Sequence, residues 1–241
     1  MLELSVNELK KTYQGRKIVD GVSLYLKAGE VVGLLGPNGA GKTTCFYMMA
    51  GLIPPDSGTV LMNGLDITDQ PMHVRAMKGL GYLAQEPSIF RRLSVKDNVL
   101  AILENRQDLS KTEQLQLCSE LLVEFGIHHL SDNRAISLSG GERRRLEIAR
   151  ALAVEPKFML LDEPFAGVDP ISIIEIQRII KHLSEREIGV LITDHNVRET
   201  LGICQRAYIL AEGKMLTSGD PQHILDNQNV RSIYLGENFR L

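Results

Sequence analysis

A glycine-rich turn, set between an apolar segment and a helix-forming segment, constrains this chain more than any other feature. It runs from Gly36 to Thr43 and fits the pattern G-x-x-x-x-G-K-[ST] at every fixed position. Glycines allow backbone N–H groups to wrap around anionic oxygens, because no Cβ atom stands in the way. A helix expected from Lys42 to about Ala50 adds its positive end at the same point. The turn therefore predicts a phosphate-binding loop.

The residue types of this loop also predict how it holds a nucleotide. Lys42 supplies a point charge to the β- and γ-phosphates, and the Thr43 hydroxyl is a hard oxygen ligand for Mg²⁺. The alternative is a glycine-rich turn without a ligand, and the strand before it and the helix after it argue against that. The predicted nucleotide contacts of the loop are Gly36, Pro37, Asn38, Gly39, Ala40, Gly41, Lys42 and Thr43.

A run of four apolar residues that ends in two carboxylates lies further along the chain. Phe158–Asp162 has the composition of a strand buried on both faces, which delivers Asp162 and Glu163 to the carboxyl end of a parallel sheet. One acid can hold Mg²⁺, and the next can polarise a water molecule for attack on the γ-phosphate. Many buried strands end in aspartate, so the run is informative only together with the phosphate-binding loop.

A second glycine pair opens a helix between these two segments, in the sequence Leu138-Ser139-Gly140-Gly141-Glu142. Ser139-x-x-Glu142 is a capping box, so a purely structural role stays open. Two glycines are unfavourable inside a helix, however, and they favour contact with a ligand. Together, the loop, this helix start and the acid pair predict an ATP-driven protein that works as a pair and is coupled to another component.

The alternation of strand-like and helix-like segments predicts an α/β fold with a mostly parallel sheet flanked by helices. We expect one domain over residues 1–241, with residues 88–135 as its helical lobe. Asn63-Gly64 is a strong hairpin dipeptide, and Asp169-Pro170 supplies a cap and a first-turn proline to a helix. The expected strands are 22–27, 30–35, 60–62, 158–162 and 189–193, with short strands around 212–214 and a final helix.

Composition excludes several classes of protein. The net charge is −3, so a nucleic-acid partner is not expected, and the three arginines at 143–145 are flanked by glutamates that favour a solvated helix face. No apolar run reaches the roughly 18–20 residues of a membrane-spanning helix. No secretion signal is recognisable. Three scattered cysteines suit a reducing compartment, so we expect a cytoplasmic protein.

The motifs occur in the order typical of the ATPase subunits of ABC transporters, and the chain resembles that family over essentially its whole length. The resemblance implies a P-loop ATPase cassette with a RecA-like core, an N-terminal antiparallel β subdomain and a helical subdomain. It rests on the loop 36–43, Gln85 after Tyr82-Leu83-Ala84, Leu138–Glu142, Asp162-Glu163, Val168-Asp169-Pro170 and His195.

This resemblance assigns roles beyond the loop. Glu163 is the implied catalytic carboxylate, supported by His195 at the γ-phosphate, with a capping histidine as the alternative for His195. Tyr13 is implied to stack on the adenine, with a strand-edge aromatic as the alternative. Ser139 and Gly141 are implied to complete the nucleotide site of the opposite subunit, so the expected unit is a homodimer that sandwiches two ATP molecules. The implied catalytic residues are Glu163, His195 and Gln85, the implied Mg²⁺ ligands are Thr43, Gln85 and Asp162, and Thr44 joins the phosphate contacts.

A narrower resemblance, again end to end, is to the ATPase subunits of lipopolysaccharide export transporters. It rests on residues 88–95, 140–145, 162–170 and 192–200 and on the closing segment 234–241, which generic cassettes do not share. The chain departs from it at Cys45 and Ala84, where these ATPases usually carry threonine and proline.

The narrower resemblance implies partners and a location. The partners are two transmembrane permease subunits and the periplasmic bridge components of the exporter, and the chain meets the cytoplasmic face of the bacterial inner membrane only through them. Phe90, Arg91 and Arg92 are the hypothesised partner interface, because an aromatic beside arginines is favoured at interface anchors. The alternative is that Phe90 belongs to the core and the arginines are solvated.

Three rival functions have weaker support. The ATPase of a branched-chain amino-acid importer shares the motifs but differs after Gln85 and in the closing segment. A non-transport ABC ATPase that acts on DNA or ribosomes usually carries coiled-coil inserts or two tandem cassettes, and this sequence has neither. A GTPase needs an Asn-Lys-x-Asp guanine reader, and no Asn-Lys pair occurs.

Overall fold

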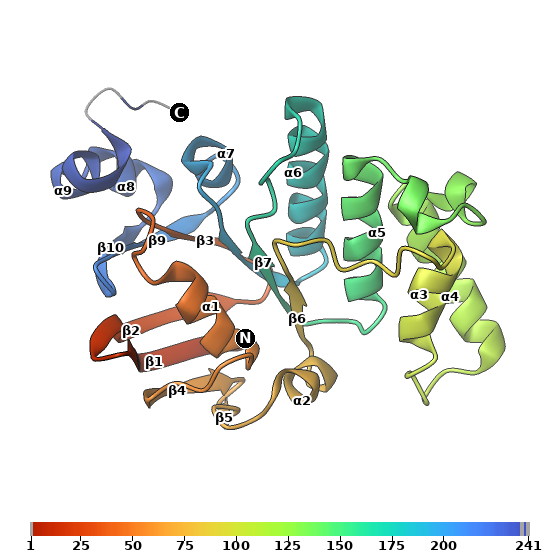
Figure 1. Ribbon diagram of the computed structural model, residues 1–241, viewed down its shortest axis with the longest axis horizontal. Helices are drawn as coiled ribbons and strands as arrows, with labels where there is room; N and C mark the ends of the chain where they lie inside the picture. The colour runs from red at the N-terminus through yellow and green to blue at the C-terminus, as the bar shows by residue number, and fades with distance from the viewer. Residues whose placement is uncertain (1, 237–238, 240–241) are drawn as a thin grey trace.

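The computed structural model describes residues 2–236 and 239, and these form two β-sheets with helices between and around them (Figure 1). Residues 237, 238, 240 and 241 of the closing segment lie outside the described residues, as does Met1. The α/β class with a mostly parallel sheet, predicted from the alternation of segments, is confirmed.

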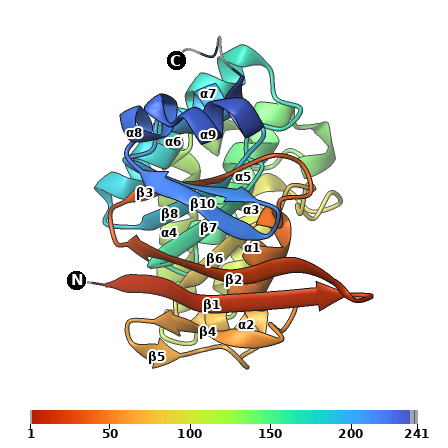
Figure 2. The same ribbon diagram turned by 90° about the vertical axis from the view of Figure 1, so that its left-hand side faces the viewer.

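The first sheet is antiparallel and has the strand order β2-β1-β4-β5 (Figure 2). The Asn63-Gly64 hairpin is confirmed, since both residues have positive φ and Met62 pairs with Leu65. Positive φ at both central residues is what a two-residue hairpin turn requires. The strands of this antiparallel sheet are β1 (Glu3–Tyr13), β2 (Arg16–Lys27), β4 (Ser57–Met62) and β5 (Leu65–Asp66).

The second sheet has the order β10-β9-β3-β8-β7-β6, with all pairs parallel except β9 with β10. Every residue of β3, β7 and β8 is buried, which explains their continuous apolar sequences. Because β3, β8 and β7 are parallel neighbours, their carboxyl ends lie at the same edge of this sheet. The strands are β3 (Val31–Leu35), β6 (Leu80–Leu83), β7 (Phe158–Asp162), β8 (Gly189–Thr193), β9 (Arg206–Ala211) and β10 (Lys214–Gly219).

Helix α1 (Lys42–Ala50) packs between the two sheets, because Phe46, Met48 and Met49 share one core with residues of both. The end of α1 is held by Arg75 on α2 (Met72–Met77), whose side chain is 1% exposed. The Arg75 guanidinium donates to the carbonyl oxygens of Met48 at 2.8 Å and Met49 at 2.6 Å. It also donates to the carbonyls of Thr68 at 2.7 Å and Gln70 at 2.8 Å.

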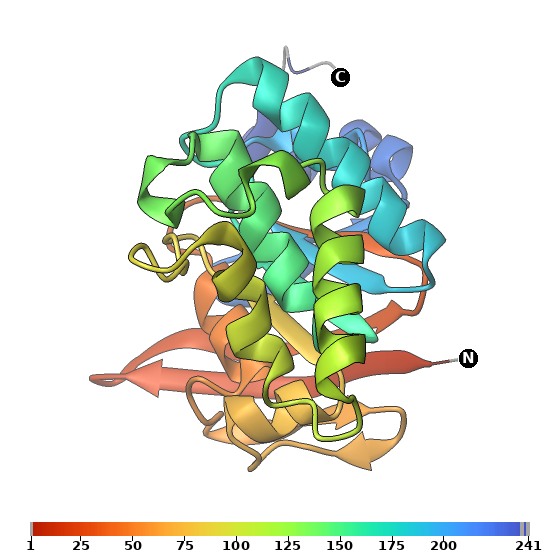
Figure 3. The same ribbon diagram turned by 90° about the vertical axis from the view of Figure 1, so that its right-hand side faces the viewer.

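The helical side of the molecule is built on α3 (Val95–Leu103), α4 (Lys111–Glu124) and α5 (Gly140–Leu152), which lie side by side (Figure 3). Ser94 and Ser110 cap the starts of α3 and α4, and Gly126 adopts a left-handed conformation after α4. The apolar core of α3 and α4 continues into α5 and the parallel sheet. The limits 88–135 for a separate lobe therefore stay a prediction.

The remaining helices cover the other parts of the parallel sheet. Helix α6 (Pro170–Glu185) is capped by the predicted Asp169, and α7 (Val197–Leu201) follows β8. The chain closes with α8 (Pro221–Asp226), α9 (Gln228–Val230) and a π-turn at Arg231–Leu235; 3₁₀ turns span His128–Leu130 and Ala135–Ser137. No helix among the described residues is both long and apolar enough to span a bilayer.

Candidate active site

The phosphate-binding loop connects β3 to α1 and needs its glycines for two separate reasons. Gly36, Gly39 and Gly41 have φ values of 145°, 78° and 101°, in the left-handed region that favours glycine. A Cβ at Gly36 would also lie 2.0 Å from the Leu210 carbonyl oxygen, and one at Gly41 would lie 2.5 Å from that of Ile18. Packing therefore leaves room for glycine alone at positions 36 and 41, whereas Gly39 is favoured by its backbone conformation.

The start of α1 leaves its backbone donors without a side-chain cap. Gly41 occupies the cap position and has no side chain to accept a hydrogen bond. Among the described helices of nine or more residues, the other four all have a side-chain cap. Free N–H groups at the positive end of a helix bind anions, so the start of α1 is suited to phosphate.

Lys42 lies at the centre of the loop. Its ammonium donates to the carbonyl oxygens of Gly36 at 2.7 Å and Pro37 at 3.0 Å, and its side chain is largely buried. Burial lowers the pKa of Lys42, while the nearby carboxylates of Glu163 and Asp162 act in the opposite direction. The Lys42 ammonium and the carboxylates of Glu163 and Asp162 thus lie close to one another, beside the loop that is suited to phosphate.

Glu163 is held in an unusual backbone conformation directly after β7. Its φ is 45°, and its N–H donates to the Thr193 carbonyl of the neighbouring strand at 2.7 Å. Left-handed conformations are costly for residues other than glycine and cluster at functional sites. One carboxylate oxygen, Oε2, accepts from Gln85 Nε2 at 2.8 Å and lies 3.3 Å from His195 Nδ1. The three predicted catalytic residues therefore meet at one oxygen atom.

Asp162 ends β7 with a carboxylate that is only 3% exposed. Burial raises its pKa to about 6, and the nearby Glu163 adds to the rise, while Tyr82 and Arg144 oppose it. Tyr82 donates to Oδ2 at 3.3 Å, and among the described residues no lysine or arginine forms an ion pair with Asp162. A buried carboxylate of this kind is suited to a cation supplied from outside the chain.

Mg²⁺ fits the chemistry of this donor set. It prefers oxygen ligands and is usually held by one or two carboxylates together with substrate phosphates, rather than by a full protein cage. Asp162 provides one carboxylate, Thr43 a hydroxyl and Gln85 an amide oxygen. Among the described residues, no group of three or more histidine, cysteine or acidic side chains is arranged so that it could hold a metal ion by itself.

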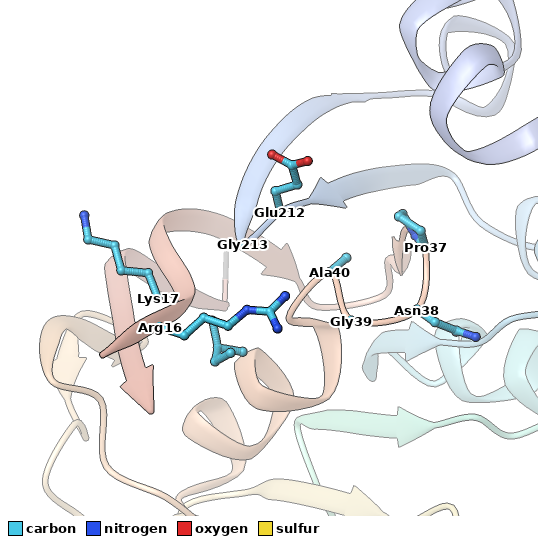
Figure 4. A pocket seen from close by; sticks show the side chains of 9 residues that line it. Arg16, Lys17, Pro37, Asn38, Gly39, Ala40, Glu212 and Gly213 are labelled. Atoms are coloured by element: carbon cyan, nitrogen blue, oxygen red, sulfur yellow. The ribbon is translucent and has the colours of Figure 1, made fainter. Parts of the chain in front are cut away.

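A cavity of about 260 Å³ joins the loop to Glu163 and contains the predicted contacts Lys42, Thr43 and Thr44. A second cavity of about 400 Å³ shares Asn38, Gly39 and Ala40 with the first and extends to Glu212 and Gly213 (Figure 4). Arg16 lines both cavities and extends towards the loop, whereas Lys17 points away from it. The first cavity is lined by Arg16, Ile18, Asn38, Gly39, Ala40, Gly41, Lys42, Thr43, Thr44 and Glu163.

Two residues of this site were missed by sequence reasoning. Arg16 was not predicted, although it follows the Gln14-Gly15 turn directly and a basic residue near a phosphate-binding loop is a recognisable signal. Asp194 is completely buried and accepts from the backbone N–H groups of Phe165 at 2.9 Å and Asn196 at 2.8 Å. It thus ties the segment after Glu163 to the segment that carries His195.

Besides Gly36 of the loop itself, three predicted nucleotide contacts do not line either cavity. Tyr13 ends β1 with an exposed ring, beneath the Lys11 ammonium at 5.6 Å from its centroid. Ser139 and Gly141 lie at the start of α5, where the predicted capping box is present. Ser139 lines neither of the two cavities of its own chain. This placement is compatible with a contact to the nucleotide of a second chain. The roles of all three residues stay predictions.

The predicted partner interface is exposed. The Phe90 side chain is 45% exposed and lies beneath the Arg150 guanidinium, 4.5 Å from the ring centroid. Arg91 and Arg92 are also exposed. The alternative that Phe90 is a core residue is therefore wrong. Next to it, a largely apolar groove of about 440 Å³ runs between α2, β6 and α5 and includes Leu52, Met72, Tyr82, Ser88, Ile102 and Arg150.

Known proteins resemble this chain over most of its length. The family model described as ABC transporter matches residues 19–166. The chain belongs to the ABC transporter family. As a member it is an ATPase cassette, and the fold predicted from the motifs is confirmed. Among solved structures, an ATP-binding cassette of an ABC transporter in its ADP conformation superposes with a TM-score of 0.87 at 29% identity, covering 98% of this chain and 100% of the other.

Curated relatives extend the comparison over the whole chain. The lipopolysaccharide export system ATP-binding protein LptB of Escherichia coli K12 is 58% identical over 241 residues, 100% of both chains. The protein of the same description from Acidithiobacillus ferridurans is 60% identical over 238 residues, 99% of this chain and 98% of the relative. A cassette from Clostridium perfringens, described as part of an ABC transporter complex, is 30% identical with a TM-score of 0.85 and covers 95% and 92% of the two chains.

Proposed function

We propose that this chain is the ATP-hydrolysing subunit of a transporter that extracts lipopolysaccharide from the inner membrane and moves it to the outer membrane. The observation that carries the proposal is end-to-end identity of 56–60% with curated ATP-binding proteins of lipopolysaccharide export. The aligned region includes the closing segment 234–241, which generic cassettes do not share.

The geometry supports a direct mechanism for hydrolysis. The nucleotide phosphates would lie against the open start of α1 and the Lys42 ammonium, with Mg²⁺ held by Thr43, Asp162 and the Gln85 amide oxygen. Mg²⁺ supplies charge neutralisation to the phosphates when it is bound. The Glu163 carboxylate, oriented by Gln85 and His195 at one oxygen, accepts a proton from the attacking water.

The decisive test of this mechanism is Glu163→Gln, which keeps the shape of the side chain and removes its basicity. The loop is unchanged, so the variant should retain ATP, while hydrolysis should fall by about 10²–10⁴-fold. Retention of radiolabelled ATP and release of phosphate measure the two properties separately. Hydrolysis near the wild-type rate would show that Glu163 is not the base.

We propose further that the working unit is a head-to-tail homodimer. Support comes from the placement of Ser139 at a helix start outside the cavity of its own chain. Cysteines introduced near Ala40 and Ser139 should crosslink between chains, with a higher yield when ATP is added to the Glu163→Gln variant. Crosslinks confined to single chains would contradict the homodimer.

The membrane partners we propose are two permease subunits, reached through Phe90, Arg91 and the adjacent apolar groove, with the periplasmic bridge components joined to those subunits. This arrangement makes the chain peripheral on the cytoplasmic face of the inner membrane. Phe90→Ala and Arg91→Ala should leave folding and hydrolysis by the isolated protein intact and abolish co-purification with the membrane complex, with Leu115→Ala as an exposed control on α4. Normal co-purification of the variants would show that the docking surface lies elsewhere on the chain. If the wild-type protein co-purified with the permease subunits of another transporter, lipopolysaccharide would not be the cargo.

A further inference from the structure

Tyr82 connects three parts of the molecule through one side chain. It lies on β6, the edge strand of the parallel sheet, and lines the apolar groove. Its ring meets that of Tyr47 on α1 edge-on, with centroids 6.5 Å apart and planes at 86°. Its hydroxyl donates to Asp162 Oδ2 at 3.3 Å. The ring therefore packs against the helix that follows the phosphate-binding loop, and the hydroxyl reaches the acid at the end of β7.

The Tyr82 hydroxyl has a role beyond packing, because it donates a hydrogen bond to Asp162. A phenylalanine would fill the same space against Tyr47, because only the hydroxyl oxygen would be missing. Asp162 is almost completely buried, and among the described residues Tyr82 is the one side chain that donates to it. The Tyr82 hydroxyl acts on one carboxylate oxygen, Oδ2, and no hydrogen bond in the described part of the chain reaches Oδ1.

We propose that Tyr82 is a positioning residue for divalent-cation binding, which fixes the Asp162 carboxylate so that Oδ1 is presented to Mg²⁺. The proposal rests on the metal role given to Asp162 above. Metal-binding carboxylates are commonly hydrogen-bonded by neighbouring groups that fix their orientation, and loss of such a partner typically lowers metal affinity 10–100-fold. Because the hydrogen bond here is long, we expect an effect at the lower end of that range.

The test is Tyr82→Phe, with Tyr208→Phe as the matched control. Tyr208 is also a largely buried tyrosine of the parallel sheet, but its hydroxyl lies away from the site. The hydroxyl accepts from the Tyr25 N–H at 3.1 Å and from Arg206, and it donates to the Tyr25 carbonyl at 3.3 Å. Binding of a fluorescent, non-hydrolysable ATP analogue to the full chain is measured in EDTA and then across a Mg²⁺ titration. Thermal unfolding of each variant shows that it is folded.

We expect Tyr82→Phe to bind the analogue normally in EDTA and to need about tenfold more Mg²⁺ for the half-maximal metal effect. Tyr208→Phe should match the wild type. In an Asp162→Asn background, Tyr82→Phe should add nothing further, since the two residues act as one unit. An unchanged Mg²⁺ midpoint, an equal shift in Tyr208→Phe, or an equal loss in EDTA would overturn the inference. If the wild type itself shows no Mg²⁺ effect on binding, the metal role of Asp162 fails as well.

Discussion

The starts of α1 and α5 make an informative comparison, because both are glycine-containing helix starts predicted to meet phosphate, yet they are built in opposite ways. At α1, Gly41 provides no cap and the first-turn N–H groups have no side-chain partner. At α5, the Ser139 hydroxyl and backbone N–H are both engaged by the Glu142 carboxylate, at 2.7 Å and 2.8 Å. At the start of α1 no side chain caps the backbone donors, whereas at the start of α5 the serine and the Glu142 N–H are paired within the chain.

The difference shows that the two starts contribute to stability with opposite sign. A serine cap with its capping box stabilises a helix by about 1 kcal/mol, so the start of α5 is favourable in the isolated chain. The start of α1 lies beside a buried ammonium and the buried Asp162 carboxylate, which are unfavourable until a ligand and a cation neutralise them. A nucleotide should therefore stabilise the fold strongly through α1, whereas Ser139 must exchange its bonds with Glu142 before it can act on a second chain.

The largest expected effect comes from Lys42→Ala, which removes the ammonium at the start of α1. Loss of one partner of a desolvated charge pair costs about 2–5 kcal/mol, so ATP affinity should fall by at least about 30-fold. Equilibrium binding of a fluorescent ATP analogue measures the change. Affinity within twofold of the wild type would show that the open start is not where the phosphates bind.

Asp162→Asn tests whether the buried carboxylate beside the start of α1 lowers the unfolding free energy of the chain. The folded-state pKa is raised from 3.8 to about 6, so burial of the carboxylate imposes no penalty below about pH 4 and its full penalty above pH 6. The variant should therefore gain about 1–3 kcal/mol of unfolding free energy at pH 8, and this gain should shrink as the pH falls towards 5. Urea unfolding at a series of pH values, without nucleotide, measures it. A destabilised variant at pH 8 would contradict the comparison.

Ser139→Ala separates capping from function, with Ser110→Ala in the equivalent capping box of α4 as its control. Both variants should lose about 1 kcal/mol of unfolding free energy. Only Ser139→Ala should also lower ATP hydrolysis, by about tenfold, while nucleotide affinity of the single chain stays unchanged. Equal hydrolysis in the two variants would return Ser139 to a purely structural role.

The smallest expected effect is that of Arg16→Ala, which tests whether the open start extends to the neighbouring strand. Arg16 is exposed, so loss of its charge should weaken ATP binding only about threefold, and the loss should shrink at high salt. Lys17→Ala, which removes a cation pointing away from the loop, is the control. An identical response of both variants would show that only the overall charge matters.

The sequence predicted the elements of the parallel sheet and its site better than the rest of the fold. Buried strands such as Phe158–Asp162 have continuous apolar sequences, and glycine loops and capping boxes are local, so each can be recognised without knowing what packs against it. The strand Glu3–Tyr13 was missed because its pairing with β2 and β4 is interrupted by bulges, which break the alternation of apolar and polar residues.

Contacts between distant segments could not be predicted in the same way. The sequence predicts strands at 22–27 and 30–35, but nothing local shows that these two strands lie in different sheets. The meeting of Gln85, Glu163 and His195 at one oxygen depends on the order of β6, β7 and β8 in the sheet. Tyr82, Arg16 and Asp194 were overlooked as site residues because their partners are brought to them only by the fold.

The four hydrogen bonds of Arg75 have a mechanical consequence. They join α2 and the segment before it to the last turn of α1, whose first turn follows the phosphate-binding loop. Met72 and Ala76 of α2 line the apolar groove. A displacement of α2 would therefore pull on the end of α1, because α2 cannot separate from this helix without breaking hydrogen bonds of a buried guanidinium. The groove and the nucleotide loop are thus connected through the length of α1.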